Sequence, residues 1–395
     1  MSCALPDSTE EILRLAAETG DKIAARAAAV DSGAAHSGES YQALRDAGLL
    51  ALLVPREAGG AGLSFLDYTR VLEVLAARDA ATALGFNMHN VAIGSLCEAR
   101  SAGLPPAAAE FRDWLFREVV AERRMFASAV SEAGTGAKLR GIRTTYRADG
   151  DGFVLDGAKS FVSLSGLADY FMVAAKPEGA ANPDEVTHFV VGAQDPGVSF
   201  GELWDGAAMN GTRTATMRLE GVRLPRGRLF LGVEGMSLYR LVREPHWMVS
   251  GYTGVYLGIA QALLDEVVSF VRDSERHAAS PVTRQEVGRM SAEVRAARAL
   301  VYAAGELIGR RRGSTEANAA VHAAKYTVGE LAPRLALTAV RICGSAALSR
   351  NRPVERLLRE SCFAMVMPAK PEECLEYLGK ATLGVNLRDS TALDW

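Results

Sequence analysis

The side chains that most often carry chemistry are scattered along this chain of 395 residues, and few of them share a recognised spacing. Its six histidines form no HxxxH or HExxH pattern, so the sequence predicts no metal site. The five cysteines include no CxxC pair, which favours free thiols in a reduced, cytoplasmic setting. The stretch GTGAKL after Ala133 is only weakly similar to a phosphate loop, because no lysine–hydroxyl pair follows it.

Two stretches contain groups that could accept a proton. His89 stands alone in GFNMHN, and a histidine among apolar residues is more often a hydrogen-bonded core residue than a base. Glu372 and Glu373 follow Pro371 in MVMPAKPEE, where they would lie in the first turn of a helix and complement its dipole. The folded context has to decide whether either stretch is catalytic.

The composition is that of a globular protein with enough apolar residues for a core, since 49% of the residues are hydrophobic and 23% are charged. A net charge of −3 without a long basic run argues against nucleic-acid binding. The N-terminal stretch lacks the basic and apolar regions of a signal peptide, and no apolar run reaches transmembrane length. We therefore expect a cytoplasmic protein that does not bind a membrane.

Three kinds of sequence follow one another and define the elements that must position a site. Residues 1–125 show helical spacing, beginning with a capping box at Ser8 and Glu11. Residues 126–235 contain short β-branched or alternating runs separated by turns such as DGDG, which predicts an antiparallel sheet or small barrel. Residues 236–395 return to amphipathic segments, three long and one shorter, which predict a four-helix bundle. The fold class is α+β, and the lack of βαβ alternation excludes a Rossmann sheet.

Several stretches in this order resemble the acyl-CoA dehydrogenase family of flavoproteins. SAVSEAGTGA resembles the family's TEPxAGSD loop, and GDGFVLDGAKSFVSLSGLADYFMV resembles its GDGYVLNGxKxWITNA strand pair. AMNGTRTATMRLEGVRLP is similar to its GMRGTxxxxLxFxxVxVP segment, and the match covers nearly the whole chain. The resemblance implies an N-terminal helical domain, a middle β-sheet domain, a C-terminal four-helix bundle, non-covalently bound FAD, and a homodimer or homotetramer.

The resemblance places the stretch SAVSEAGTGA along the polar edge of the flavin ring. That edge needs hydrogen-bond donors, because it gains negative charge when the flavin is reduced. The matching positions are Ser128, Val130 and Ser131, with Gly136 further along. Ser131 could instead simply cap a turn.

The strand-pair stretch would supply a second flavin contact. Phe161 takes the family's tryptophan position against one ring face, and Ser163 takes the threonine position near N5. The alternation in SFVSL is equally typical of any half-buried strand.

The FAD pyrophosphate site departs from the family pattern. The arginine that reaches the pyrophosphate of a neighbouring subunit aligns with Ser274, and Arg276 lies two residues further on. The glutamine that serves the same group aligns with Arg341 of RICGS, whose Gly344 matches a family glycine. An arginine binds a diphosphate better than a glutamine does. We therefore expect Arg341 to take over the role of the arginine that is missing at position 274. Arg341 could also be an ordinary surface residue.

The usual catalytic glutamate is missing. In most family members it removes the α-proton of an acyl thioester while flavin N5 takes a hydride, and its position aligns with Pro368. A subset of members places it on an earlier helix, at the position of Met248. The candidate substitutes are Glu244, which shares a face with Met248 if one helix contains both, and His89.

Three functions fit these observations. The first is an FAD-dependent dehydrogenase of an acyl thioester, carried by coenzyme A or an acyl-carrier protein and passing electrons to an acceptor protein or oxygen. The alternative is a flavin-dependent monooxygenase of the same fold, which would need no glutamate at Pro368. A catalytically inactive scaffold is the third, although it would have no need of the flavin-contacting stretches.

Overall fold

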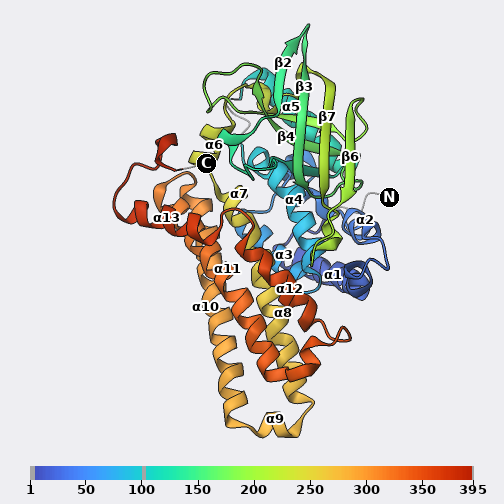
Figure 1. Ribbon diagram of the computed structural model, residues 1–395, viewed down its shortest axis with the longest axis vertical. Helices are drawn as coiled ribbons and strands as arrows, with labels where there is room; N and C mark the ends of the chain where they lie inside the picture. The colour runs from blue at the N-terminus through green and yellow to red at the C-terminus, as the bar shows by residue number, and fades with distance from the viewer. Residues whose placement is uncertain (1–4, 100–103, 394–395) are drawn as a thin grey trace.

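The computed structural model describes residues 5–99 and 104–393, and it has the predicted α+β class and the predicted order of helices, sheet and helices. Figure 1 shows the sheet at the top, the long helices of the bundle at the bottom, and the N-terminal helices between them and to one side.

Among the N-terminal helices, α3 packs against α4, whose residues are almost all buried. Ser8 accepts a hydrogen bond from the Glu11 amide (3.2 Å), which confirms Ser8 as the N-cap, while the Glu11 carboxylate accepts from the Ser8 hydroxyl (2.9 Å). Between α2 and Pro55 the chain forms a 3-10 turn at Leu49–Ala51. The helices are α1 (Thr9–Asp31), α2 (Gly38–Asp46), α3 (Phe65–Ala76), α4 (Ala80–Cys97) and α5 (Pro106–Val120).

The middle region is a seven-stranded sheet of order β1-β4-β2-β3-β7-β6, with β5 paired to β4. Most neighbours are antiparallel as expected, but β1 and β2 each run parallel to β4, so a purely antiparallel sheet is not correct. The strands are β1 (Phe126–Ala129), β2 (Thr145–Asp149), β3 (Gly152–Val162), β4 (Tyr170–Pro177), β5 (Thr187–Gly192), β6 (Val198–Leu203) and β7 (Ala215–Pro225).

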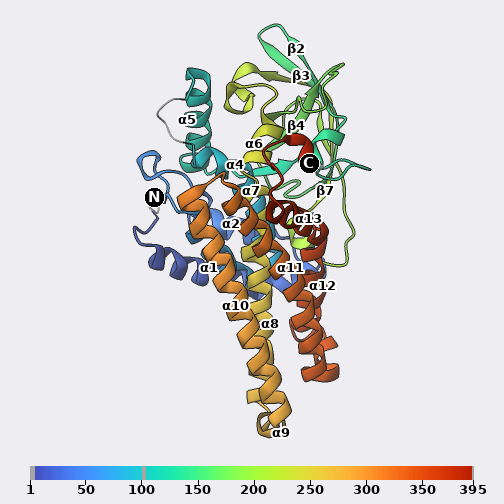
Figure 2. The ribbon, with the colours of Figure 1, turned by 90° about the vertical axis from the view of Figure 1, so that its left-hand side faces the viewer.

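The C-terminal region forms the bundle, and its long helices begin at serine caps such as Ser280 and Ser314. Figure 2 shows α8, α10 and α11 side by side, with α5 beside the sheet and away from the bundle. The helices are α6 (Ser237–Arg243), α7 (His246–Val249), α8 (Thr253–Arg272), α9 (Glu275–Ala279), α10 (Pro281–Arg311), α11 (Thr315–Cys343), α12 (Val354–Ser361) and α13 (Pro371–Thr382).

Two stretches of the bundle, His246–Arg272 and Thr315–Leu348, are long and apolar enough to cross a membrane by length and composition alone. The expectation that no apolar run reaches this length is therefore wrong. In the most apolar window of each stretch, 67% and 44% of the residues are buried within the molecule, which is what core helices of a bundle also show.

After α13 the chain returns to the sheet domain, and we call residues 383–393 the C-terminal strap. The Arg140 guanidinium donates to Asp184 Oδ1 (2.7 Å) and to the carbonyls of Ser390 (2.6 Å) and Leu393 (3.1 Å). The hydrogen bond from Arg140, with a second one from the Ser390 hydroxyl (2.9 Å), holds the pKa of Asp184 below its usual range. One side chain of the middle domain thus fixes the end of the described chain.

Candidate active site

The predicted flavin-binding segments lie side by side at the ends of β1 and β3. The Ser160 amide donates to the Ser131 carbonyl (2.8 Å), so residues 128–131 contact residues 160–163 directly. Gly136 closes the turn that follows, where its amide and that of Glu132 each donate to the other's carbonyl (3.0 Å). The structure therefore brings Ser128, Val130, Ser131, Phe161 and Ser163 to one place, with Gly136 in the adjoining turn.

A buried ion pair, which the sequence analysis missed, fixes these two segments together. Lys159 Nζ lies 2.7 Å from Glu132 Oε1, and their side chains are 0% and 3% exposed. The Glu132 carboxylate also accepts from the Arg143 and Thr144 amides and from the Thr144 hydroxyl. A lysine at an inward position of a strand was the available signal, since a buried charge requires a partner.

The electrostatics of this pair fit a structural role rather than proton transfer. Burial raises the pKa of Glu132, but the Lys159 charge and the hydrogen bonds outweigh it and leave that pKa below its usual range. Burial lowers the pKa of Lys159 to about 8, although Glu132 opposes the shift. Four donors already bind the Glu132 carboxylate, three of them at Oε1 and one at Oε2, and its side chain is 3% exposed, which favours a structural role.

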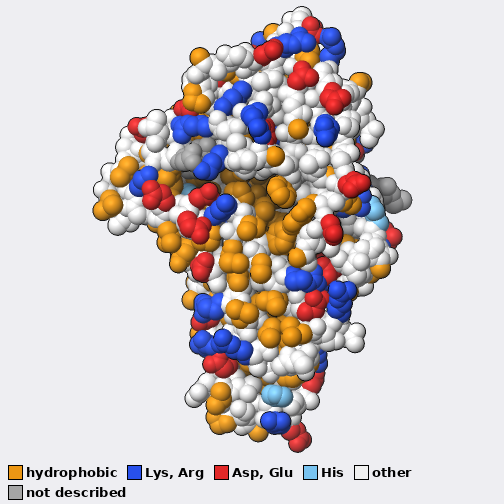
Figure 3. Space-filling view, in the orientation of Figure 1, with side chains coloured by type: hydrophobic (Ala, Val, Ile, Leu, Met, Phe, Trp, Pro, Cys, Tyr) orange, Lys and Arg blue, Asp and Glu red, His pale blue; other side chains and the backbone are white. Residues whose placement is uncertain are grey.

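An exposed aromatic surface borders the same place. The Phe161 ring is 63% exposed, and its backbone has φ of 53°, which is uncommon for a residue with a bulky side chain. Its ring centroid lies 5.8 Å from that of Trp204, which in turn lies 5.9 Å from that of Phe363. Met365 and Val366 extend this surface, and Figure 3 shows hydrophobic side chains gathered in a hollow between the sheet domain and the bundle.

These features fit a bound flavin. We call the surface formed by residues 128–131, residues 160–163, Trp204 and the turn Cys362–Met365 the flavin position. Its exposed rings would be covered by a planar ring system, and the buried Ser160 hydroxyl finds no hydrogen-bond partner in the described part of the chain. Ser163 belongs to a hydroxyl chain in which its Oγ lies 3.0 Å from Thr214 Oγ1 and that atom lies 2.9 Å from Thr212 Oγ1.

The turn before Pro368 is held by two side chains of the bundle. Tyr256 donates to the Phe363 carbonyl (3.1 Å), and Lys325 donates to the Ala364 carbonyl (2.9 Å). Lys325 is buried, which lowers its pKa to about 8. The turn that ends at Pro368 is therefore fixed in place beside the flavin position. Pro368 itself, where most family members have a glutamate, provides no carboxylate.

The second position for a base is equally unable to take a proton. Met248 packs against an aliphatic cluster that contains Val130, Leu238 and Val242. Val130 of the flavin position belongs to the same cluster, so one aliphatic core links Met248 to that part of the molecule. Glu372 and Glu373 lie in the first turn of α13, where Glu373 accepts from the Lys370 amide (2.8 Å), so the capping interpretation fits that residue.

The geometry does not support Glu244 or His89 as a substitute for the missing catalytic base. Glu244 does not share a helix with Met248, because α6 ends at Arg243 and α7 begins at His246. Pro245 separates the two helices, and Glu244 Oε2 instead lies 3.4 Å from Arg312 Nε. The premise that Glu244 projects beside Met248 is therefore wrong.

His89 is a core residue whose two ring nitrogens are both occupied. Its Nδ1 accepts from the Phe126 amide (3.0 Å), so its Nε2 carries the hydrogen and donates to the Leu50 carbonyl (2.9 Å). It is 0% exposed, and burial lowers its pKa to about 4. His89 thus connects α4 to β1 and leaves no lone pair for a substrate.

The residues proposed for the pyrophosphate lie far from this surface. Arg276 belongs to α9, which forms the lower tip of the bundle in Figure 1. Arg341 and Gly344 lie at the end of α11, and both are exposed. Among the described residues Arg341 has no ion-pair partner within 4.0 Å, so its charge is available to another molecule. Within one chain these residues do not join the flavin position.

Comparison with known proteins agrees with the fold. Family models described as the N-terminal, middle and C-terminal domains of acyl-CoA dehydrogenase match residues 7–100, 127–222 and 251–367. YdbM of Bacillus subtilis (strain 168), assigned by name to the acyl-CoA dehydrogenases, is 31% identical over 89% of this chain and 90% of its own.

Two further similar proteins are named for two different reactions, one a dehydrogenase and the other a nitrososynthase. Cyclohexane-1-carbonyl-CoA dehydrogenase of Geobacter metallireducens is 28% identical over 91% of this chain and 94% of its own. A crystal structure of nitrososynthase from Micromonospora carbonacea var. africana superposes with a TM-score of 0.84 at 25% identity, covering 97% of this chain and 99% of that one. Since the three family models together match most of its length, this chain belongs to the acyl-CoA dehydrogenase family of flavin-binding oxidoreductases.

Proposed function

We propose that this protein is a flavin-dependent monooxygenase that uses reduced flavin and oxygen to oxygenate a small, largely apolar substrate. One observation carries the proposal: neither position that holds the proton-abstracting carboxylate in the family can accept a proton, since they are occupied by Pro368 and Met248. The substitutes Glu244 and His89 are engaged elsewhere. The flavin-contacting segments are nevertheless retained, which argues against an inactive scaffold.

The bound flavin would supply the activation of oxygen, and the chain's own residues would provide the surroundings. Phe161 would cover one face of the ring, and the Ser163 hydroxyl would lie near its reactive edge. Trp204, Phe363 and Met365 would exclude water from the reacting atoms. An apolar substrate with an electron-rich nitrogen, sulfur or carbon suits this lining. The substrate gains one oxygen atom, the second leaves as water, and a separate reductase returns electrons to the flavin.

The test combines two measurements on the flavin-loaded protein. Under anaerobic conditions we expect no bleaching of the flavin with a panel of acyl-CoA and acyl-carrier-protein thioesters. With a flavin reductase and isotopically labelled oxygen, we expect amines, thioethers or indoles to acquire the label in at least one product. Bleaching by a thioester without oxygen incorporation would reject the proposal.

The second candidate is an acyl-thioester dehydrogenase, and the identities to proteins named as acyl-CoA dehydrogenases favour it. Such an enzyme would need a base that this chain does not place at either family position. It would transfer its electrons to an acceptor protein. The anaerobic titration separates the two candidates, because only a dehydrogenase reduces its flavin with the thioester alone.

We further propose that the flavin is FAD and that its pyrophosphate is bound by Arg341 of a neighbouring chain in a homodimer or homotetramer. Leu337 and Leu348 are 54% and 59% exposed near Arg341, which suits burial against a second copy. Arg341→Ala should weaken FAD binding about tenfold and leave FMN binding unchanged, because FMN has no pyrophosphate. Arg289→Ala, at an exposed site on α10, is the matched control. Unchanged FAD affinity in Arg341→Ala would remove Arg341 from the site.

A further inference from the structure

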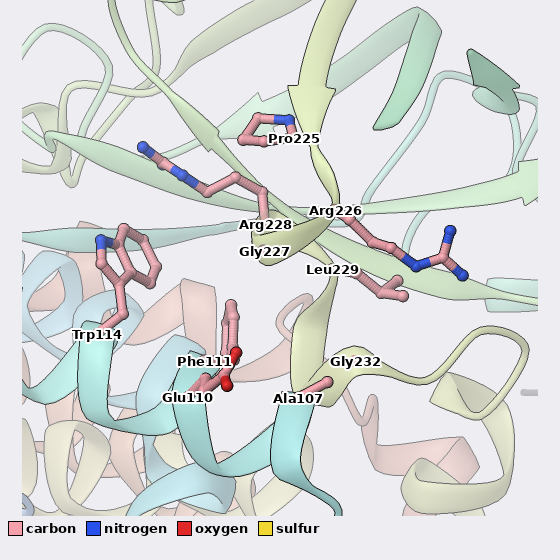
Figure 4. A pocket seen from close by; sticks show the side chains of 10 residues that line it. All are labelled: Ala107, Glu110, Phe111, Trp114, Pro225, Arg226, Gly227, Arg228, Leu229 and Gly232. Atoms are coloured by element: carbon pink, nitrogen blue, oxygen red, sulfur yellow. The ribbon is translucent and has the colours of Figure 1, made fainter. Parts of the chain in front are cut away.

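A second cavity lies apart from the flavin position, between α5 and the turn that follows β7. Its volume is about 450 Å³, which is within the usual range for small-molecule sites. Figure 4 shows Phe111, Trp114 and Glu110 rising from α5 toward a wall formed by Arg226, Arg228 and Leu229. None of the residues assigned to the flavin position lines this cavity.

Two aromatic rings of the α5 wall are held rigidly by others behind them. The centroids of Phe111 and Trp114 are 5.7 Å apart. Phe111 contacts Phe230 edge to face (5.5 Å, 70°), and Trp114 contacts Tyr170 in the same way (5.4 Å, 74°). Because these rings are fixed before any ligand binds, the wall presents a preformed apolar surface.

The opposite wall carries an arginine, Arg228, whose charge is stacked on two aromatic rings and has no carboxylate beside it among the described residues. The Arg228 guanidinium lies 4.5 Å from the centroid of Trp114 and 4.9 Å from that of Tyr170. No carboxylate lies within 4.0 Å of it among the described residues, and its Nη1 is buried without a hydrogen-bond partner. The nearby Glu118 carboxylate is engaged by the Tyr170 hydroxyl (3.0 Å). A guanidinium remains charged at any physiological pH, so this charge favours an anion in the cavity.

The remaining charged residues limit what that anion can be. Glu110 lines the same cavity and is exposed, so a second negative charge on the ligand would be repelled. Arg226 also lines it, but Figure 4 shows its guanidinium directed away from Arg228, and it lies 5.7 Å from the centroid of Phe153. The cavity therefore offers one cationic contact beside a flat apolar wall.

We propose that this cavity binds a small planar aromatic monocarboxylate, with its carboxylate on Arg228 and its ring against Phe111 and Trp114. A guanidinium and a carboxylate can form two parallel hydrogen bonds, and the flat body matches the aromatic wall. The site is independent of the proposed oxygenation, since its walls come from α5 and the turn after β7.

The probe is benzoate, titrated by calorimetry into the flavin-loaded protein. We expect saturable binding of one benzoate per chain and at least tenfold weaker binding of benzamide, which has the same ring and no charge. Inorganic phosphate should bind at least tenfold more weakly than benzoate, because it has no ring and a greater charge. Phosphate binding as tightly as benzoate would reject the aromatic part of the proposal.

Variants locate the site within the molecule. Arg228→Met should weaken benzoate binding at least tenfold, and Trp114→Leu should weaken it several-fold. Arg226→Met, which changes an arginine directed elsewhere, should change it less than twofold. Arg228→Lys, which keeps the charge, should fall between the wild type and Arg228→Met and guards against misfolding of the latter. Equal affinity in the wild type and Arg228→Met, or no saturable binding in the wild type, would overturn the proposal.

Discussion

The two walls of the flavin position are built in opposite ways. On the sheet side, the Glu132–Lys159 pair and its hydrogen bonds hold the flavin-contacting segments with buried charge. On the bundle side, Met248, Phe363 and Pro368 present aliphatic and aromatic surface with no group that can take a proton. On the proposed function, this chain keeps the wall expected to hold the flavin and lacks the proton-accepting group on the other wall.

The largest effect should follow from breaking the polar wall. Lys159→Met leaves the buried Glu132 carboxylate without its counter-charge, which should lower the free energy of unfolding by about 3–5 kcal/mol. The variant should also lose flavin, because residues 128–131 and 160–163 would separate. Urea unfolding and a flavin titration measure both.

Two further variants show whether that effect belongs to the buried pair. Lys159→Met combined with Glu132→Gln should recover part of the lost stability, because no unpaired charge remains. Arg223→Gln, in an exposed pair with Asp149, should cost less than about 1 kcal/mol. A similar loss in Lys159→Met and Arg223→Gln would contradict the assigned role of the buried pair.

The next effect is a loss of stability in acid caused by His89, which connects the sheet wall to α4. Its folded pKa of about 4 lies below the ordinary 6.5, so the unfolded chain binds a proton that the folded one does not between these pH values. Stability should therefore fall as the pH decreases from about 6.5 to about 4, by on the order of 3 kcal/mol from this residue.

The measurement is the free energy of unfolding at pH 7 and pH 5. His89→Gln should lose less stability on acidification than the wild type, by on the order of 2 kcal/mol, because glutamine does not titrate. His36→Gln, at an exposed site, should behave as the wild type. An unchanged acid loss in His89→Gln would show that this residue does not carry the effect.

A smaller effect should come from the aromatic border that the two walls share. Phe161→Ala removes a ring that is 63% exposed in the flavin-free chain, so the stability of that chain should change little. The flavin dissociation constant should rise about tenfold, because the ring would no longer cover one face of the cofactor. Fluorescence titration measures this, and Leu383→Ala, at an 83% exposed site on the strap, is the control. Equal flavin affinity in Phe161→Ala and the wild type would place the flavin elsewhere.

The smallest effect on folding and flavin affinity is expected at the bundle wall itself. Pro368→Glu should change flavin affinity less than twofold, yet it would restore a carboxylate at the head of the turn held by Tyr256 and Lys325. Anaerobic bleaching by an acyl-CoA, not expected for the wild type, should then become measurable. If Pro368→Gln bleached equally, the new activity would not depend on a carboxylate.

The sequence was sufficient for those features that local patterns determine. The change from helical to alternating spacing predicted the three regions, and the Ser8 cap was confirmed at the residue expected. The parallel pairing of β1 with β4 could not be predicted, because a strand's own pattern does not record which neighbour it joins.

In the candidate site, too, the sequence predicted the features that local motifs determine and missed those that depend on contacts between distant segments. Motif positions predicted which residues gather at the ends of β1 and β3, and they do lie together. The substitute bases failed because each depended on a detail that spacing does not fix. The helix containing Met248 does not extend to Glu244, and the two nitrogens of His89 are bound to Leu50 and Phe126, which are distant in sequence. The Glu132–Lys159 pair was missed because its partners lie on different segments.

Arg140 has a consequence for the order in which the chain is completed during synthesis. Its carbonyl partners in the C-terminal strap lie 250 and 253 residues further along the chain. At roughly 5–20 residues per second, a ribosome needs about 12–50 s to deliver them after Arg140 has emerged. The sheet domain can therefore form early, but this arginine acquires its full set of partners only when translation reaches the strap. A nascent chain stalled before residue 390 would carry an Arg140 that still lacks those two carbonyls, so this contact reports that translation has passed the strap.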